Sequence, residues 1–362
     1  MAATIAGSVS QQSSEERAQL RHKADSLKWI AFVILLLGIA ITLLAAATAT
    51  PGESPATAGI LLFAPIPAGT LLWSVIYRRS KRYRALSAQD VLASDPRPHV
   101  VYLRSFRADD ASSLGMAGKD LNYYWRVLHP IKAWGTILNI WDTRTEEEIM
   151  AEVLHQIGPV VAIGRPGEKL PQLGAARVYA SDETWKQTIH ELFKQAGLVV
   201  LLVGKTEGFF WEVEQSANTV DPTRLILLVP AWRRGYEDFC QRAGNHFPKG
   251  LPAYKSSWGR REFGANVLGK VAAMVHFKPD WTPVFVDFAR VKWPWKYKLE
   301  MGGRRDLVNV YDWALQPVYQ QLGIDWKPPR IGPAQLGVLL VKSMPILILI
   351  FALVIIAYGT SR

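Results

Sequence analysis

Two carboxylates and a few basic side chains have the types and spacing that could support chemistry. Glu212 and Glu214 follow Trp211 in the string WEVE, shortly after the apolar segment GLVVLLV. Basic residues stand after apolar segments in the same way, at Arg104, Arg165 and Lys169. Guanidinium groups and the backbone N–H groups of turns both suit phosphate, so these positions are candidates for contact with a ligand. An acid in the first turn of a helix is also stabilised by the helix dipole alone, so the carboxylates are candidates rather than assigned catalytic groups.

These side chains must be positioned by an alternation of strands and helices between Asp95 and Arg330. Near-continuous apolar segments predict the strands, and amphipathic segments between them predict the helices. We expect strands at 99–106, 159–163, 197–203, 224–229 and 283–288, and helices at 145–157, 182–196, from 210 onwards and at 306–322. This pattern is typical of a mostly parallel sheet with helices on both faces. The fold class is therefore α/β, with one domain over residues 98–325 and its working groups on loops at the carboxyl ends of the strands.

The helix expected at 145–157 carries a start signal. Thr145 and Glu148 have the spacing of a capping box, in which each side chain bonds to the other residue's backbone N–H. The acidic run Glu146–Glu148 is interpreted as a solvated first turn. A long aromatic insert, residues 108–142, separates this helix from the first strand, and loops of that length are commonly functional or carry extra structure.

The order of these features resembles a TIR (Toll/interleukin-1 receptor) domain, a flavodoxin-like fold, over roughly residues 98–232. The first strand with Ser105 is similar to the opening box of that family. The turn Arg165-Pro166-Gly167 is similar to the family's BB loop, and Trp211 with a following Glu stands at its Trp-plus-Glu site. The longer string from YLRSF through GPVVAIGRPGEKLPQLGAARVY to WEVE resembles a group of bacterial multi-pass membrane proteins.

The resemblance implies a chemistry. Catalytic TIR domains cleave the nicotinamide–ribose bond of NAD, so NAD is implied as a substrate, and no other cofactor is expected. A carboxylate stabilises the positive charge that builds on the sugar, as in glycosidases, and Glu212 would take that role. The family places its Glu four residues after the Trp, where this chain has Gln215, so Glu212 and Glu214 both remain candidates. The ligand-binding residues implied are Arg104, Ser105, Arg165, Gly167, Lys169 and Trp211.

Three apolar segments predict transmembrane helices at 28–49, 58–77 and 336–358. The first two lack charged residues apart from Lys28 at the edge, and the third contains only Lys342. Each is long enough to cross about 30 Å of hydrocarbon as a helix. Residues 1–27 are expected to be a disordered tail, and residues 78–97 a basic linker.

The placement of Lys and Arg predicts the orientation. The loop between the first two segments has no basic residue, whereas RRSKRYR follows the second one directly. Because cytoplasmic flanks are enriched in Lys and Arg, the N-terminus and the main domain are expected in the cytoplasm and the C-terminus outside. We therefore expect a multi-pass protein of a bacterial inner membrane, with the lipid bilayer as one partner.

The surplus of charge is local. The formal net charge is +11, and residues 78–84 and 290–305 each contribute +5. The second patch also contains Trp293, Trp295 and Tyr297, a mixture suited to lipid headgroups or to single-stranded nucleic acid. With apolar segments so near, we favour the lipid surface and do not expect nucleic acid as a partner.

Three functions from different classes remain open. The first is a membrane-tethered TIR-like signalling or defence module that acts through ligand or protein contacts and forms a homo-oligomer, as TIR domains commonly do. The second is an NAD-type nucleotide glycohydrolase that uses Glu212, and the third is a non-catalytic envelope scaffold. A single cysteine, Cys240, excludes a disulfide framework and a Cys-based zinc site, and no metal site is expected.

Overall fold

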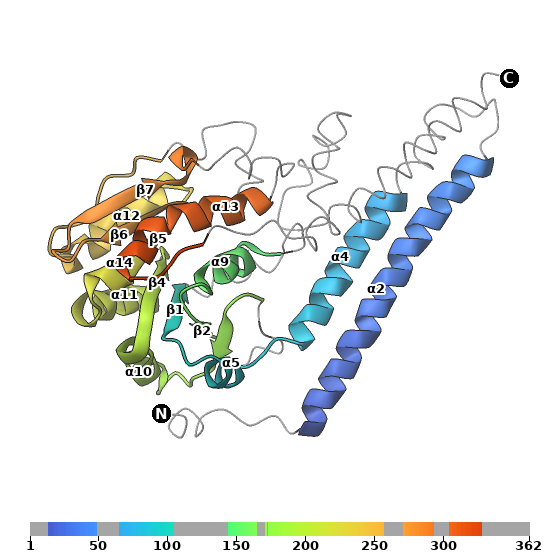
Figure 1. The fold of residues 1–362 in the computed structure, drawn as a ribbon, viewed down its shortest axis with the longest axis horizontal. Helices are drawn as coiled ribbons and strands as arrows, with labels where there is room; N and C mark the ends of the chain where they lie inside the picture. Colours follow the sequence, from blue (N-terminus) through green and yellow to red (C-terminus); the bar gives the residue numbers. More distant parts are fainter. Residues whose placement is uncertain are drawn as a thin grey trace, which may run out of the picture. The chain divides into compact units, whose positions relative to one another are not determined.

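The computed structural model describes residues 14–48, 65–104, 144–164, 171, 173–256, 271–292 and 304–327 of the 362 (Figure 1). The chain divides into two units, which we treat separately. One is an α/β unit that contains every strand of the described residues. The other contains the helix pair α2 (Ser14–Thr48) and α4 (Pro65–Tyr83).

The α/β unit is built on one seven-stranded sheet with the order β3-β2-β1-β4-β5-β6-β7. The first five strands are mutually parallel, whereas β6 pairs antiparallel with both β5 and β7. The strands are β1 (His99–Arg104), β2 (Val160–Ile163), β3 (Ala176–Val178), β4 (Ala196–Leu202), β5 (Leu225–Pro230), β6 (Val271–Phe277) and β7 (Pro283–Asp287). The sheet is therefore mixed.

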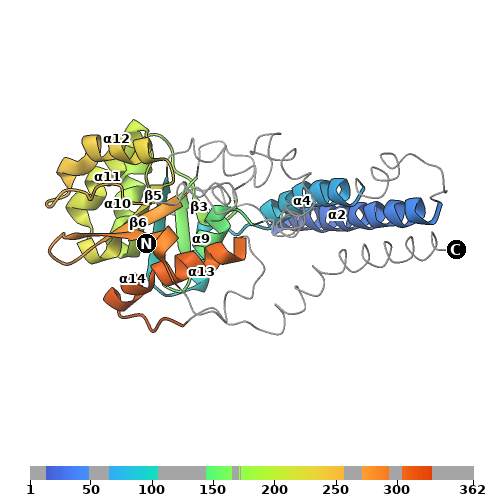
Figure 2. The ribbon, with the colours of Figure 1, turned by 90° about the horizontal axis from the view of Figure 1, so that it is seen from above.

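Helices cover both faces of the sheet, and each face has its own apolar core (Figure 2). One face is covered by α5 (Ala88–Ser94), α10 (Trp185–Gln195), α11 (Glu207–Thr219) and α12 (Arg233–Ala243). The other face is covered by α9 (Glu146–Leu154), α13 (Arg304–Ala314) and α14 (Gln316–Gln321). Alternation along the strands divides the side chains: in β1, Val101 and Leu103 point to the first face, and Val100 and Tyr102 to the second.

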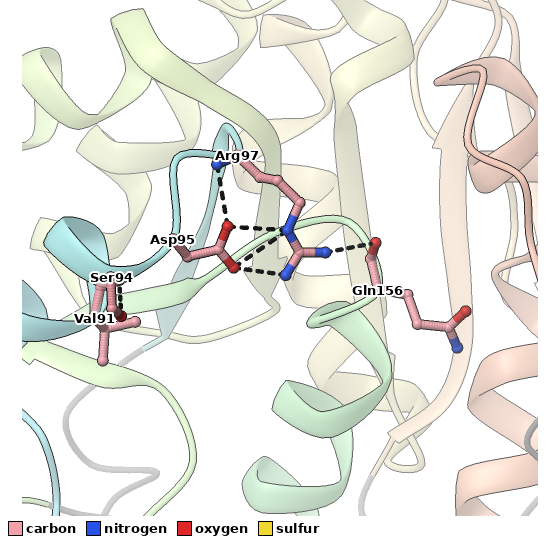
Figure 3. A network of polar contacts seen from close by, with 5 residues as sticks. All are labelled: Val91, Ser94, Asp95, Arg97 and Gln156. Atoms are coloured by element: carbon pink, nitrogen blue, oxygen red, sulfur yellow. Dashed lines mark hydrogen bonds and ion pairs between the residues drawn. The ribbon is translucent and has the colours of Figure 1, made fainter.

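A polar network fixes the chain where it enters β1 (Figure 3). The Nε and Nη2 atoms of Arg97 donate to both carboxylate oxygens of Asp95, at 2.6–3.2 Å, and Nη1 donates to the carbonyl oxygen of Gln156 at 3.2 Å. The Arg97 guanidinium lowers the pKa of Asp95 to about 2. The segment before β1 is thereby tied to the chain just after α9.

A second polar network centres on Asp312, which is fully buried on α13. Its Oδ1 accepts from Gln156 Nε2 at 2.6 Å and from Tyr319 Oη at 3.3 Å, and its Oδ2 accepts from Trp326 Nε1 at 3.1 Å. Burial raises the pKa of Asp312 to about 6, although the three donors each lower it. The network joins α13, α14, the end of α9 and the chain that follows α14.

In the other unit, α2 packs antiparallel against α4. The small residues Ala24, Ala31 and Gly38 are buried on α2, and they recur every seventh position, which keeps them on one side of the helix. Gly69 of α4 approaches so closely that an added Cβ would lie 3.3 Å from the carbonyl oxygen of Ile34. Most of the large apolar residues of α2 are exposed, among them Trp29, Leu37 and Leu44.

The sequence predicts the α/β class and the covering of both faces correctly, and the capping box of Thr145 and Glu148 is confirmed. The strand expected at 283–288 is present as β7, whereas β6 was not expected. Because β6 is antiparallel to both of its neighbours, a flavodoxin-like parallel sheet is not confirmed. The prediction of a disordered tail over residues 1–27 is wrong from Ser14 onwards, because α2 begins there. Residues 78–97 are not simply a linker, since they contain the end of α4 and all of α5.

Among the described residues, one stretch is long and apolar enough to cross a membrane, Ala18–Ala45 within α2. An apolar helix near an N-terminus meets the same criteria when it is a signal sequence. The second expected segment, 58–77, lies only partly within the described residues, and the third, 336–358, lies outside them.

Candidate functional site

The candidate site lies at the carboxyl edge of the sheet, where the parallel strands β1 and β4 are neighbours. The next helix after β4 is α11, on the first face, whereas the next described helix after β1 is α9, on the opposite face. Chain connections that leave adjacent strands in opposite directions form a topological switch point, the usual ligand-binding position in open α/β sheets. The first turns of α11 follow the end of β4 directly.

Glu212 occupies the second turn of α11. The side chains that α11 buries are Phe209, Val213 and Ser216, one turn apart on the face toward the sheet. Glu212 is adjacent to Val213 and one turn from both Phe209 and Ser216, so it lies at the border of this buried face. The helix itself contacts α10, α12 and β1.

The side chain of Glu212 is half-buried, and one of its carboxyl oxygens is shielded from solvent. Its Oε2 is buried and has no hydrogen-bond partner among the described residues. Burial is the cause of its shifted titration and raises the pKa of Glu212 to about 8. Because an unpaired buried carboxylate is costly, the group is mostly protonated at neutral pH in the free protein. A perturbed, unpartnered acid at a ligand-binding edge is a functional candidate.

Trp211 belongs to an aromatic cluster between the first turns of α10 and α11. Its ring lies edge-on to Trp185 at 4.8 Å and to His190 at 5.5 Å between centroids. The ammonium of Lys186 stands 5.1 Å from the centre of the Trp211 ring and 5.8 Å from that of Trp185. Trp211 is thus a partly buried member of a surface cluster, packed on the core rather than within it.

Glu214 projects from a different side of α11. At 3.6 residues per turn, two positions rotate a side chain by about 200°, so Glu214 points away from the enclosed position of Glu212. The two candidates are therefore distinct in environment, and Glu214 provides a matched control for removal of a carboxylate from this helix.

Arg104, expected to bind phosphate, is engaged within the fold. Its Nη2 lies 2.9 Å from Oε2 of Glu147, and Nη2 of Arg177 lies 2.7 Å from Oε1 of the same carboxylate. The three side chains are 6%, 5% and 2% exposed for Arg104, Glu147 and Arg177. Glu147 thus joins the end of β1 to β3, which flank β2 on either side.

Glu146 and Glu148, which flank Glu147 at the start of α9, also have partners. Glu146 Oε1 accepts from Tyr311 Oη at 2.5 Å and from the backbone N–H of Val271 at 3.0 Å, and Glu148 completes the capping box. The acidic run forms the first turn of α9, as expected. It is not solvated throughout, because Glu147 is buried against β1 and β3 and Glu146 bonds to β6 and α13.

The remaining sequence candidates, Ser105, Arg165, Gly167 and Lys169, lie outside the described residues. Three residues that contact Trp211 are not among the site residues expected from the sequence: Trp185, Lys186 and His190. Trp185 and His190 are five residues apart, which is not the spacing of one helix face, so the sequence pattern does not indicate that both lie beside Trp211. Within the described ranges, no group of three or more His, Cys, Asp or Glu side chains could hold a metal ion.

Comparison of the chain with protein-family models, with curated proteins and with solved structures finds no match. The resemblance to TIR domains therefore stays a prediction from the sequence motifs, and a function can be inferred only from the geometry of the site.

Proposed function

We propose that this chain is a membrane-tethered, TIR-like signalling or defence module whose α/β domain binds a small ligand at the carboxyl edge beside Trp211 and Glu212. The observation that carries the proposal is the unpartnered Oε2 of Glu212. A buried acid without a partner lowers the stability of the free fold, and a ligand that contacts this oxygen would supply the missing partner.

The chemistry of Glu212 favours a ligand with a cationic or hydrogen-bond-donating part. A positive group near the carboxyl would stabilise its ionised form and lower the pKa from about 8. A neutral donor would satisfy Oε2 directly. Phosphate groups of the same ligand would be held by Arg165, Lys169 and the turn around Gly167, as the sequence predicts for these residues.

Tethering is supported by α2, whose Ala18–Ala45 stretch is long enough to span a bilayer. Its outward apolar side chains suit lipid rather than water: Trp29 is 67% and Leu44 is 64% exposed. The multi-pass topology and the cytoplasmic placement of the main domain remain part of the proposal, on the basis of the Lys and Arg distribution.

The same carboxyl favours a second candidate, an NAD-type glycohydrolase. Departure of neutral nicotinamide from C1′ of the ribose leaves an oxocarbenium ion, which water then captures with release of a proton. Ionised Glu212 would stabilise that cation, and the positive charge of the nicotinamide ribosyl group would promote its ionisation. Since kcat/KM reports the free enzyme, it should rise with pH up to about 8.

The test uses the full chain in lipid nanodiscs with NAD and related nucleotides, and follows nicotinamide release and melting temperature together. A ligand-dependent rise in melting temperature that Glu212→Gln abolishes and Glu214→Gln preserves supports the binding module. Nicotinamide release that Glu212→Gln abolishes and Glu214→Gln preserves supports the glycohydrolase. Equal behaviour of wild type and Glu212→Gln with every nucleotide would reject both and favour a scaffold.

A further inference from the structure

The antiparallel register of α2 and α4 is fixed at two places. Near one end, Ser80 Oγ donates to the carbonyl oxygen of Ala24 at 2.6 Å. Further along, Gly69 meets α2 at Gly38, where an added Cβ would lie 3.4 Å from the Cα. Levels on one helix can therefore be related to levels on the other.

Each helix has one boundary between basic and apolar residues, and this register places the two boundaries at the same level along the pair. On α2 the break from basic to apolar residues falls between Lys28 and Trp29, and on α4 the break from apolar to basic falls between Tyr77 and Arg78. Lys28 is four residues from Ala24 and Arg78 is two residues from Ser80, in the same direction along the pair. At 1.5 Å per residue the two breaks differ by about 3 Å, less than one helical turn.

On one side of this level the surface is apolar and ends in aromatic rings. Trp29 contacts Phe32 edge-on at 6.1 Å, and Trp73 stacks on Tyr77 at 5.2 Å. Between Trp29 and Thr48 the sequence of α2 has no charged residue. Trp and Tyr at the border of an apolar stretch are typical of the membrane–water interface.

On the other side the surface is basic, and we call it the basic collar. It comprises eight cations and a single acid, Asp25, within residues 21–28 and 78–84, for a formal charge of +7. The cations are Arg21, Lys23, Lys28, Arg78, Arg79, Lys81, Arg82 and Arg84. Asp25 pairs with Arg84 across the two helices. Lys81 stands 5.6 Å from the centre of the Tyr77 ring, so α4 passes from apolar to aromatic to cationic along one face.

We propose that the basic collar binds the anionic headgroups of phospholipids. Its charge complements acidic lipid, and its apolar border places it at the depth of the headgroups rather than in bulk water. The inference rests on the membrane attachment in the proposed function and goes beyond it, because attachment alone requires no preference among lipids. Soluble polyanions would meet the same charge but not the aromatic border.

The experiment measures lipid selectivity of the full chain in vesicles of phosphatidylcholine containing spin-labelled phosphatidylglycerol or spin-labelled phosphatidylcholine. The fraction of each label immobilised by the protein gives the preference for the anionic lipid. We expect a several-fold preference for the anionic lipid, which falls at high salt and is largely lost when three cations of the collar are neutralised.

The test variant is Arg78→Gln with Arg79→Gln and Arg82→Gln, which spares the Arg84–Asp25 pair. The matched control is Lys194→Gln with Lys205→Gln and Arg233→Gln, three exposed cations of the α/β unit. Loss of the preference in the first variant only is the expected result. If the protein stays in the membrane after carbonate extraction but shows no preference for the anionic lipid, headgroup binding by the basic collar is refuted and membrane attachment is not. If carbonate releases the protein, both membrane attachment and headgroup binding are refuted.

Discussion

Removal of the Glu212 carboxyl should stabilise the fold, and by an amount that depends on pH. The perturbation is Glu212→Met, which keeps the length of the side chain and leaves no buried polar atom. Burial raises the pKa of Glu212 from 4.5 to about 8 in the folded protein. Each pKa unit corresponds to about 1.4 kcal/mol of difference between the protonation states.

The direction in which pH changes the free energy of unfolding follows from proton linkage. Below pH 4.5 the carboxyl is protonated in both the folded and the unfolded chain and has no linkage cost. Between pH 4.5 and about 8 the unfolded chain releases the proton while the folded chain retains it, so the free energy of unfolding falls as pH rises. At pH 7 the free energy of unfolding is lower than below pH 4.5 by about 3 kcal/mol at most, since the Glu212 side chain keeps some exposed surface. Above pH 8 the loss levels off.

The assay is thermal unfolding of the full chain in detergent at pH 5, 6, 7 and 8 for wild type, Glu212→Met and Glu214→Met. The melting temperature of Glu212→Met relative to wild type should increase steadily from pH 5 to pH 8. Glu214→Met controls for loss of a carboxylate from the same helix. Parallel pH profiles for wild type and Glu212→Met would mean that the carboxyl is solvated or paired, and the argument for a ligand contact at Oε2 would fail.

Three further predictions concern other parts of the chain. Glu147→Gln should cost about 3–5 kcal/mol in chemical denaturation, because it leaves two buried guanidinium groups without their carboxylate. Trp326→Phe should cost about 1–2 kcal/mol and raise the pKa of Asp312 above about 6, since a donor to the charged form is lost; the pH dependence of melting would show the shift. Gly69→Leu should separate α2 from α4, because its Cβ would press on the Ile34 carbonyl, and disulfide trapping between cysteines introduced on the two helices should decline.

The main elements could be predicted because their patterns are local. GLVVLLV is a buried strand by composition alone, and β4 lies there. The Thr145–Glu148 spacing is a local bonding pattern, and it forms as expected. Strand β3 is three residues long and contains Arg177, so no apolar pattern reveals it. Helix α12 was detectable from Tyr236 and Phe239 three residues apart, but its many charges conceal that face.

The site was harder to predict because it depends on packing between distant segments. The sequence places Glu212 on a helix after the third predicted strand, and it indicates neither the burial of Oε2 nor the approach of α10. Arg104 has the residue type expected for phosphate binding, yet its guanidinium is held by Glu147, from a helix beyond the long insert. Which charged groups meet is decided by the order of the strands, and residue type alone does not contain that information.

In the proposed function, a ligand reaches Glu212 at the carboxyl edge of the sheet. The most direct measurement is hydrogen–deuterium exchange of the full chain in nanodiscs, with and without NAD and a panel of related nucleotides, read at the backbone amides of α11. We expect slower exchange over the first turns of α11 with at least one nucleotide in wild type and in Glu214→Gln, and no change in Glu212→Gln. Exchange in α11 that is unaffected by every nucleotide, or slowed equally in Glu212→Gln, would refute a nucleotide contact at Glu212.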